Sequence, residues 1–345
     1  MKRYTSLLLT AFTLVLLLGL GTTYLAGSAD KPAEDKPLQT LTVYTTLPAE
    51  HAAILAAEYE KINHVKINFI PLTPQTIRQK ISEAAMSSQS TGDLVLTDAD
   101  ILRSAAADGQ LFSYESEITD SVIEDFKSSD CSWTGVWYDP VVFCVNRDYL
   151  ATLPRIPVTW LDLAEYNDVR IGITDFLAAD ASAQILFSLI ENYGEEEAFA
   201  LLRRMHPHIA QYSKYLSTPV RMAGMDEVDI SLAVQSEALR YINEGYPLQL
   251  IYPEDGTAYT LTGAAVLPNS EKKEAAEMFL DWLLGDEAQL ALQKKGFFFV
   301  PTNPATLSYK TFAGKNIVLF PHERILQEME KHAYLDHWVK DVRLQ

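Results

Sequence analysis

The first third of the chain alternates short apolar runs with amphipathic stretches, and this alternation restricts the fold more than any other feature. Three strands are predicted here, and each is followed by a helix. The predicted strands are residues 41–46 (LTVYTT), 65–70 (VKINFI) and 94–97 (LVLT). A β-α-β-α-β-α order is typical of a mostly parallel sheet with helices on both faces. We therefore predict an α/β fold.

Polar side chains stand where the first and third of these strands end. Open α/β sheets bind ligands beyond the carboxyl ends of their strands. A following helix adds free N–H groups at its start, and these attract anions. The ligand candidates at these ends are Thr45, Thr46, Thr97 and Asp98. Each has a structural alternative, because threonine can end a strand and aspartate often caps a helix.

A second α/β unit is predicted between residues 141 and 252. Strands are expected at 141–146, 170–174 and 209–213, and segments 219–224, 230–234 and 247–252 complete the unit. Helices are expected at 179–193, 195–205 and 271–295, with a surface helix at 323–342. We place lobe 1 at residues 39–140 and 266–345, and lobe 2 at residues 141–265. Strands 141–146 and 260–267 would link the lobes, and lobes linked in this way form a cleft that closes by hinge bending.

The stretch 250–267 (LIYPEDGTAYTLTGAAVL) joins a turn to a strand of small and apolar residues. Asp255-Gly256 is a tight-turn dipeptide, because glycine tolerates positive φ and aspartate bonds to its own turn. A turn with free backbone N–H groups before a buried strand would place Thr257 and Tyr259 at a ligand. The alternative is a plain loop between two core strands.

Length and composition exclude several classes of function. The chain has 345 residues, a length that suits about two domains. Its formal charge is −18. Such an acidic surface disfavours nucleic acid and anionic membranes as partners. The sequence has no Walker loop, no G-x-S-x-G motif and no carboxylate pair that stands out as acid and base. Its histidines lack the spacing of metal ligands. We therefore expect no enzyme activity, no cofactor and no bound metal.

The N-terminus has the pattern of an export signal. Lys2 and Arg3 precede an uncharged run at 7–26, and small residues follow at 26–29. The run is also just long enough to span a bilayer if it is not cleaved. We interpret residues 1–29 as a signal peptide or a membrane anchor and residues 30–38 as a polar tether. Both readings place the protein outside the cytoplasm.

The only two cysteines, Cys131 and Cys144, lie close together in the sequence. A disulfide is allowed outside the cytoplasm. We state the hypothesis that the two pair and hold the loop 133–139 on the strand 141–146. The alternative is two buried free thiols.

The order of several segments resembles a known family, the bacterial extracellular solute-binding proteins of ABC importers. It is most similar to the branch that contains receptors for ferric iron, aminoethylphosphonate and sugar phosphates. The segments are LTVYTTLPAE, GDLVLTDAD, YDPVVFCVNRDYL, residues 175–194, PEDGTAY and AAEMFLDWLLGDEAQLAL, and they cover roughly residues 41–304. The resemblance implies a two-lobed periplasmic-binding fold of type II, with a mostly parallel sheet in each lobe. It also implies ligand capture between the lobes.

The departures from the family pattern bear on the ligand. Iron receptors of this branch carry an adjacent tyrosine pair where this chain has Gln235-Ser236, which disfavours iron. Phosphate-ester receptors carry a turn rich in serine and threonine where this chain has residues 179–181, leaving Ser182 as its hydroxyl. The resemblance therefore adds Ser182 and Gln235 to the ligand candidates and weakens the case for a phosphate ester.

The sequence as a whole predicts a monomeric receptor that captures a small polar or anionic solute and delivers it to an ABC permease. The alternative is a ligand sensor, for example of sugar phosphate, that signals to a membrane histidine kinase. The missing lipoprotein cysteine and an uncleaved N-terminal anchor would fit that alternative.

Overall fold

The computed structural model describes residues 39–89, 91–166, 168–322 and 324–345. The predicted signal or anchor (1–29) and the predicted tether (30–38) lie outside these residues. Thr40–Gln345 forms one compact unit. None of the described helices is long and apolar enough to cross a membrane.

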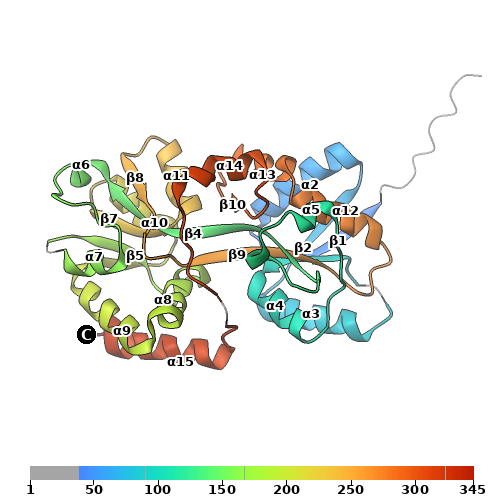
Figure 1. Ribbon diagram of the computed structural model, residues 1–345, viewed down its shortest axis with the longest axis horizontal. Helices are drawn as coiled ribbons and strands as arrows, with labels where there is room; N and C mark the ends of the chain where they lie inside the picture. The colour runs from blue at the N-terminus through green and yellow to red at the C-terminus, as the bar shows by residue number, and fades with distance from the viewer. Residues whose placement is uncertain (1–38, 90, 167, 323) are drawn as a thin grey trace, which may run out of the picture. The chain divides into compact units, whose positions relative to one another are not determined.

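The beginning of this unit has the predicted β-α-β-α-β-α order (Figure 1). Its elements are β1 (Thr40–Thr45), α2 (Ala49–Asn63), β2 (Lys66–Pro71), α3 (Pro74–Met86), β3 (Leu94–Asp98) and α4 (Ala99–Ala107). β2, β1 and β3 are parallel neighbours in that order, and β9 (Tyr259–Val266) runs antiparallel to β3. The carboxyl ends of β1 and β3 therefore lie next to each other, and helices α2 and α4 begin there.

One strand, β4 (Thr134–Asn146), belongs to both halves of the sheet, and all 13 of its residues are buried. Its first half pairs antiparallel with β9 and with β10 (Val300–Pro301). Its second half pairs antiparallel with β7 (Ile230–Val234) and β8 (Leu248–Ile251). β4 and β9 run side by side between the two halves (Figure 1). Each half with its helices is a lobe, so the predicted two-lobed α/β fold with linking strands is confirmed.

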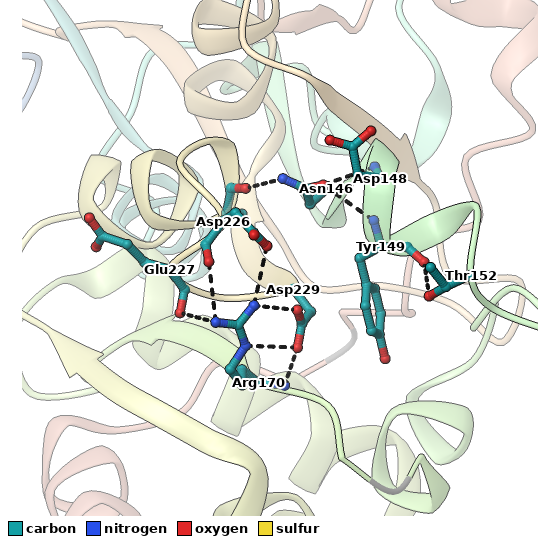
Figure 2. Close-up of polar contacts among 9 residues, drawn as sticks. Asn146, Asp148, Tyr149, Thr152, Arg170, Asp226, Glu227 and Asp229 are labelled. Atoms are coloured by element: carbon teal, nitrogen blue, oxygen red, sulfur yellow. Dashed lines mark hydrogen bonds and ion pairs between the residues drawn. The ribbon is translucent and has the colours of Figure 1, made fainter.

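The second lobe has its own parallel strands, β7, β5 (Ile171–Thr174) and β6 (Ile209–Ser213). Its helices are α6 (Arg147–Leu150), α7 (Trp160–Glu165), α8 (Asp180–Tyr193), α9 (Glu195–Met205), η2 (His206–His208), α10 (Ser217–Gly224) and α11 (Gln235–Asn243). Arg170 joins the amino ends of β5 and β7 (Figure 2), because its guanidinium and its backbone N–H each donate to Asp229 at 2.7 Å. Segment 219–224 lies within helix α10. The strands of this lobe lie close to their expected positions.

Separate apolar cores support the lobes. Leu94 and Phe279 belong to the core of the first lobe. The second lobe has a core on each face of its sheet, and neighbouring residues of β4 divide between them: Phe143 enters one and Val142 the other. Adjacent residues of a strand point to opposite faces, so a continuous apolar run on β4 satisfies both cores.

The remaining elements return to the first lobe after β9 or precede β4. They are α5 (Glu117–Asp120), η1 (Glu124–Phe126), α12 (Lys273–Leu283), α13 (Asp286–Gln293), α14 (Leu307–Phe312) and η3 (Ala313–Lys315). The single helix expected at 271–295 is two helices. The backbone of Gly285 is extended there, with φ −90° and ψ 172°, and ends the helical path.

The C-terminal elements, α15 (Glu328–Trp338) and η4 (Val339–Arg343), pack on the second lobe, although the sequence placed residues 266–345 in lobe 1. Trp338 is 1% exposed, and its ring centroid lies 4.7 Å from that of Phe176. Val342, one turn further, enters the same core. These two apolar side chains decide the packing of a segment that otherwise reads as a polar surface helix. The other lobe boundaries stay a prediction.

The disulfide hypothesis is wrong, because Cys131 and Cys144 are free thiols. β4 runs between them, and the ten residue-to-residue steps of strand from Thr134 to Cys144 cover about 33 Å. A disulfide needs Cα atoms within about 7 Å. Burial in the second lobe raises the pKa of the Cys144 thiol to about 12.

Replacing Trp338 by alanine should lower the melting temperature by several degrees or more. Truncating a buried aromatic side chain costs about 3–5 kcal/mol, and each kcal/mol shifts a domain of 150–250 residues by about 2–4 °C. Differential scanning fluorimetry measures the change. Met329 on the same helix is 81% exposed, so Met329→Ala is the matched control. Equal melting temperatures for the two variants would contradict the packing of α15.

A thiol titration of protein denatured without reductant should find both cysteines reactive, because Cys131 and Cys144 are free and are the only cysteines. The same titration after reduction is the control and should give the same value. A rise on reduction would contradict the separation that β4 imposes.

Candidate functional site

A cavity of about 440 Å³ is lined by residues of both lobes. The first lobe contributes the starts of α2, α3 and α4, and the second lobe contributes the start of α8. β9 lines it where that strand passes between the lobes, and His322, Glu328 and Lys331 of the C-terminal segment line it as well. Its volume is in the range of small-molecule sites, about 300–1,000 Å³.

Helix starts are the common feature of these walls. The first N–H groups of a helix lack partners within the helix and carry part of its positive dipole end. Within the described residues, no side chain caps α2 or α8. Their first N–H groups can therefore bind oxygen atoms of a ligand.

Asp98 lines the cavity at the start of α4. It caps α4, because its Oδ1 accepts the N–H of Asp100 at 2.9 Å. Burial and the nearby carboxylate of Asp100 raise the pKa of Asp98 to about 6. Part of its carboxylate remains free to meet a ligand.

Asp100 is the centre of a charged cluster at the next position. Its Oδ1 lies 2.8 Å from His322 Nε2 and 3.1 Å from Arg103 Nη1, and its Oδ2 lies 3.9 Å from Lys331 Nζ. Burial opposes ionisation, but these cations prevail and lower the pKa of Asp100 to about 2. His322 Nδ1 also lies 3.2 Å from Glu191 of α8. Burial alone would lower the pKa of His322, but the bond to Asp100 outweighs it and the pKa is raised.

The C-terminal segment thus supplies polar contacts to the first lobe. Besides His322 and Lys331, Glu328 lies 3.3 Å from Arg78 of α3. The same segment is anchored in the core of the second lobe through Trp338. It therefore crosses from one lobe to the other beside the cavity.

Aromatic and neutral polar side chains complete the walls. Tyr259 of β9 is half-buried, and burial raises the pKa of its phenol above the ordinary value. Phe187 and Gln184 face the cavity from α8, and Thr260 and Thr262 from β9. Apolar walls with a few placed polar groups suit a small polar solute.

Three of the residues predicted from the sequence line this cavity, namely Thr46, Asp98 and Tyr259. Thr97 is buried behind them, and its hydroxyl oxygen lies 3.1 Å from that of Thr46. Thr45 is also buried, because its hydroxyl donates to the carbonyl of Leu96 at 2.7 Å. Thr45 and Thr97 position the strand ends and do not face the cavity.

The other three predicted ligand residues, Ser182, Gln235 and Thr257, do not line the cavity and form internal bonds. Ser182 Oγ donates to backbone carbonyls of its own turn. Gln235 donates to the carbonyl of Phe298 at 3.1 Å and accepts from the Tyr252 hydroxyl at 2.7 Å. The Thr257 hydroxyl donates to the carbonyl of Val141 at 2.8 Å. Their side chains join elements of the fold.

Sequence reasoning missed the charged residues of the walls. Asp100 and Arg103 follow Asp98 at helical spacing, so the start of α4 carried a local signal. No local sequence pattern indicated His322, Glu328 or Lys331. These residues reach the cavity only through tertiary contacts, and the segment 323–342 was expected on the surface.

Metal ligands are a separate question. Within the described part of the chain, no three or more His, Cys, Asp or Glu side chains are grouped so that they could hold a metal ion. At the position of the iron receptors' tyrosine pair, Gln235 is bonded as described and the Ser236 hydroxyl donates to Asp139 at 2.5 Å.

Two lobes joined by strands, with a solute-sized cavity lined by both, define a receptor of the periplasmic-binding type II class. The chain belongs to the bacterial extracellular solute-binding protein family, whose sequence model matches residues 55–315. The proteins of this family bind solutes and are not enzymes, and the family supports a location outside the cytoplasm.

Relatives of known sequence are distant. Iron uptake protein A1 of Synechocystis is 23% identical over 326 residues, which cover 88% of this chain and 89% of that protein. An uncharacterized protein of Haemophilus influenzae is 28% identical over 251 residues, covering 70% of this chain and 72% of that protein.

Solved structures share the fold. The binding protein AfuA of Actinobacillus pleuropneumoniae, determined with fructose-6-phosphate, has a TM-score of 0.67 at 23% identity and covers 89% of this chain and 99% of its own. An extracellular solute-binding protein of Bordetella parapertussis has a TM-score of 0.72 at 19% identity and covers 88% of this chain and 99% of its own.

Replacing His322 by glutamine should lower the melting temperature more at pH 6 than at pH 8.5. The folded-state pKa of His322 is raised above 6.5, so its charged form adds stability that is complete below that value and is lost as pH rises through the raised pKa. Scanning fluorimetry at both pH values measures the difference. His332→Gln, at an exposed position of α15, is the control, and an equal pH dependence of the two variants would contradict the pairing with Asp100.

Proposed function

We propose that this protein is an extracytoplasmic receptor that captures a small polar solute between its lobes and delivers it to the permease of an ABC importer. The observation that carries this proposal is the cavity, which both lobes and the C-terminal segment line. A solute bound there contacts all three at once. Binding therefore favours the closed arrangement over the open one.

The hinge of this motion is the pair of strands between the lobes. β4 continues through both lobes, and β9 pairs with its first half. A small change of backbone angles in these strands moves whole lobes, because each lobe has its own packed core. The proposal needs no chemical step, and the residues of the cavity act by binding alone.

Export through residues 1–29 belongs to the same proposal. A cleaved signal peptide would release the receptor, and an uncleaved segment would tether it to the membrane. The tethered form suits the alternative role, a sensor that signals to a histidine kinase. Neighbouring genes separate the two roles, since permease and ATPase genes support transport and a kinase with its regulator supports sensing.

The names of the relatives do not fix the solute. One relative is an iron uptake protein, and one similar structure was determined with a sugar phosphate. The buried bonds of Gln235 and Ser236 give no support to iron held at that position. The solute of this chain follows from its own cavity.

Replacing Gln184 by tryptophan should abolish the stabilisation that a bound solute gives. Gln184 lines the cavity from α8, so a larger side chain there fills the space of the solute. A solute at 100-fold over its Kd stabilises the folded state by about 2.7 kcal/mol. The measurement is a thermal-shift screen of residues 30–345 with amino acids, polyamines, hexose phosphates, phosphoglycerates, sulfate and ferric citrate.

The matched control is Gln79→Trp, because Gln79 is exposed on α3 and does not line the cavity. It should keep the response of the unmodified protein. A response that survives in Gln184→Trp, or that no compound of the screen produces, would contradict solute capture in this cavity.

A further inference from the structure

The cations that line the cavity are already paired. Arg78 lies 3.3 Å from Glu328, Arg103 lies 3.1 Å from Asp100, and Lys331 lies 3.9 Å from Asp100. His322 bridges Asp100 and Glu191. An anionic solute would have to compete with these carboxylates for every one of them.

Two carboxylates of the walls have no such partner. Asp98 lies at the start of α4 in the first lobe, and Asp180 lies at the start of α8 in the second lobe. Within the described residues, neither forms an ion pair with a lysine, arginine or histidine, although the charges of Lys331 and His322 act on Asp98 from a longer distance. The cavity therefore offers unpaired negative charge from both lobes.

We propose that the solute carries a cationic amine or guanidinium group, which Asp98 and Asp180 bind from opposite lobes. This inference rests on the proposed function, because it assigns the chemical class of the solute captured in that cavity. A cation between the two carboxylates contributes charge-assisted hydrogen bonds to both lobes, and these are stronger than bonds between neutral groups. A cation bound to both carboxylates would also hold the two lobes together, because Asp98 and Asp180 belong to different lobes.

The surroundings of the two carboxylates fit a cation. The phenol of Tyr259 lines the same cavity, and an aromatic face attracts an ammonium or guanidinium group. Lys331 lies 5.9 Å from the ring of Phe187, so the chain itself places a cation over an aromatic wall here. The free N–H groups at the starts of α2 and α8 can bind a carboxylate or hydroxyl on the rest of the solute.

A structural role alone would also explain the two residues. Asp98 caps α4, and an acidic residue in the first turn of α8 favours its dipole. Asparagine separates the roles, because it caps a helix as well as aspartate does but carries no charge. Asp98→Asn and Asp180→Asn should therefore keep their folded structure and lose affinity for a cation.

The test is isothermal titration of the protein with L-arginine, L-lysine, agmatine and putrescine, and with glucose 6-phosphate, phosphoglycerate and citrate as anions. We expect at least one amine to bind, and each asparagine variant to weaken it by about tenfold or more, because a hydrogen bond to a charged group is worth about 1.5–3 kcal/mol. Asp108→Asn, at the exposed far end of α4, is the matched control and should bind as the unmodified protein does.

The pH dependence gives a second readout. Asp98 is faced by Asp100, His322 and Lys331, and its pKa is about 6. Affinity for an amine should therefore fall between pH 7.5 and pH 5, as Asp98 becomes protonated, and Asp98→Asn should reduce that dependence.

Each result decides between the two proposals. Binding of anions only, lost in Gln184→Trp, overturns the inference of a cationic solute and leaves the receptor role intact. Amine binding that both asparagine variants retain overturns the inference as well. Binding that persists in Gln184→Trp overturns the receptor site itself, and the inference with it.

Discussion

The continuous strand β4 is the constraint on which the rest of the structure depends. Its 13 residues are all buried, and they reach about 43 Å through both lobes. One half is fixed by β9 and β10 and the other by β7 and β8. In the second lobe the apolar run at residues 141–145 contributes side chains to a core on either face, so this lobe packs around its own half of the strand. The space between these two packed bodies is where a solute fits.

The fold followed from the sequence wherever a local pattern carried it. Alternating strands and helices predicted β1 to α4, and Ile230–Val234 matched its strand. Local patterns failed where backbone geometry or a distant partner decided the outcome. Gly285 divides a helix that its apolar spacing presents as continuous. Trp338 packs a polar segment on the second lobe through contacts with Phe176 and Tyr212, which are more than a hundred positions away in the sequence.

The site was predictable where a local pattern placed the side chain, at a strand end for Thr46 and Asp98 and after a turn for Tyr259. Thr46 and Asp98 follow parallel strands, and the topology brings such ends to one cavity. Ser182 and Gln235 were assigned through family resemblance and Thr257 through its turn, and both give the position of a residue but not the partner of its side chain. Arg78 and Glu328 are 250 positions apart, and no spacing rule connects residues at that distance.

The C-terminal segment makes two kinds of contact, and the difference has a mechanical meaning. It holds the second lobe through buried apolar side chains, which would cost several kcal/mol to expose. It touches the first lobe through ion pairs. Arg78–Glu328 is exposed, and pairs of this kind contribute about 0–1 kcal/mol each, whereas Lys331–Asp100 and His322–Asp100 are mostly buried. Water can take the place of polar contacts but not of apolar ones, so the segment would stay with the second lobe in an open form of the proposed receptor. The polar composition of this segment is typical of a surface helix. Polar side chains also suit a contact with the first lobe that would form in the closed arrangement and be lost in the open one.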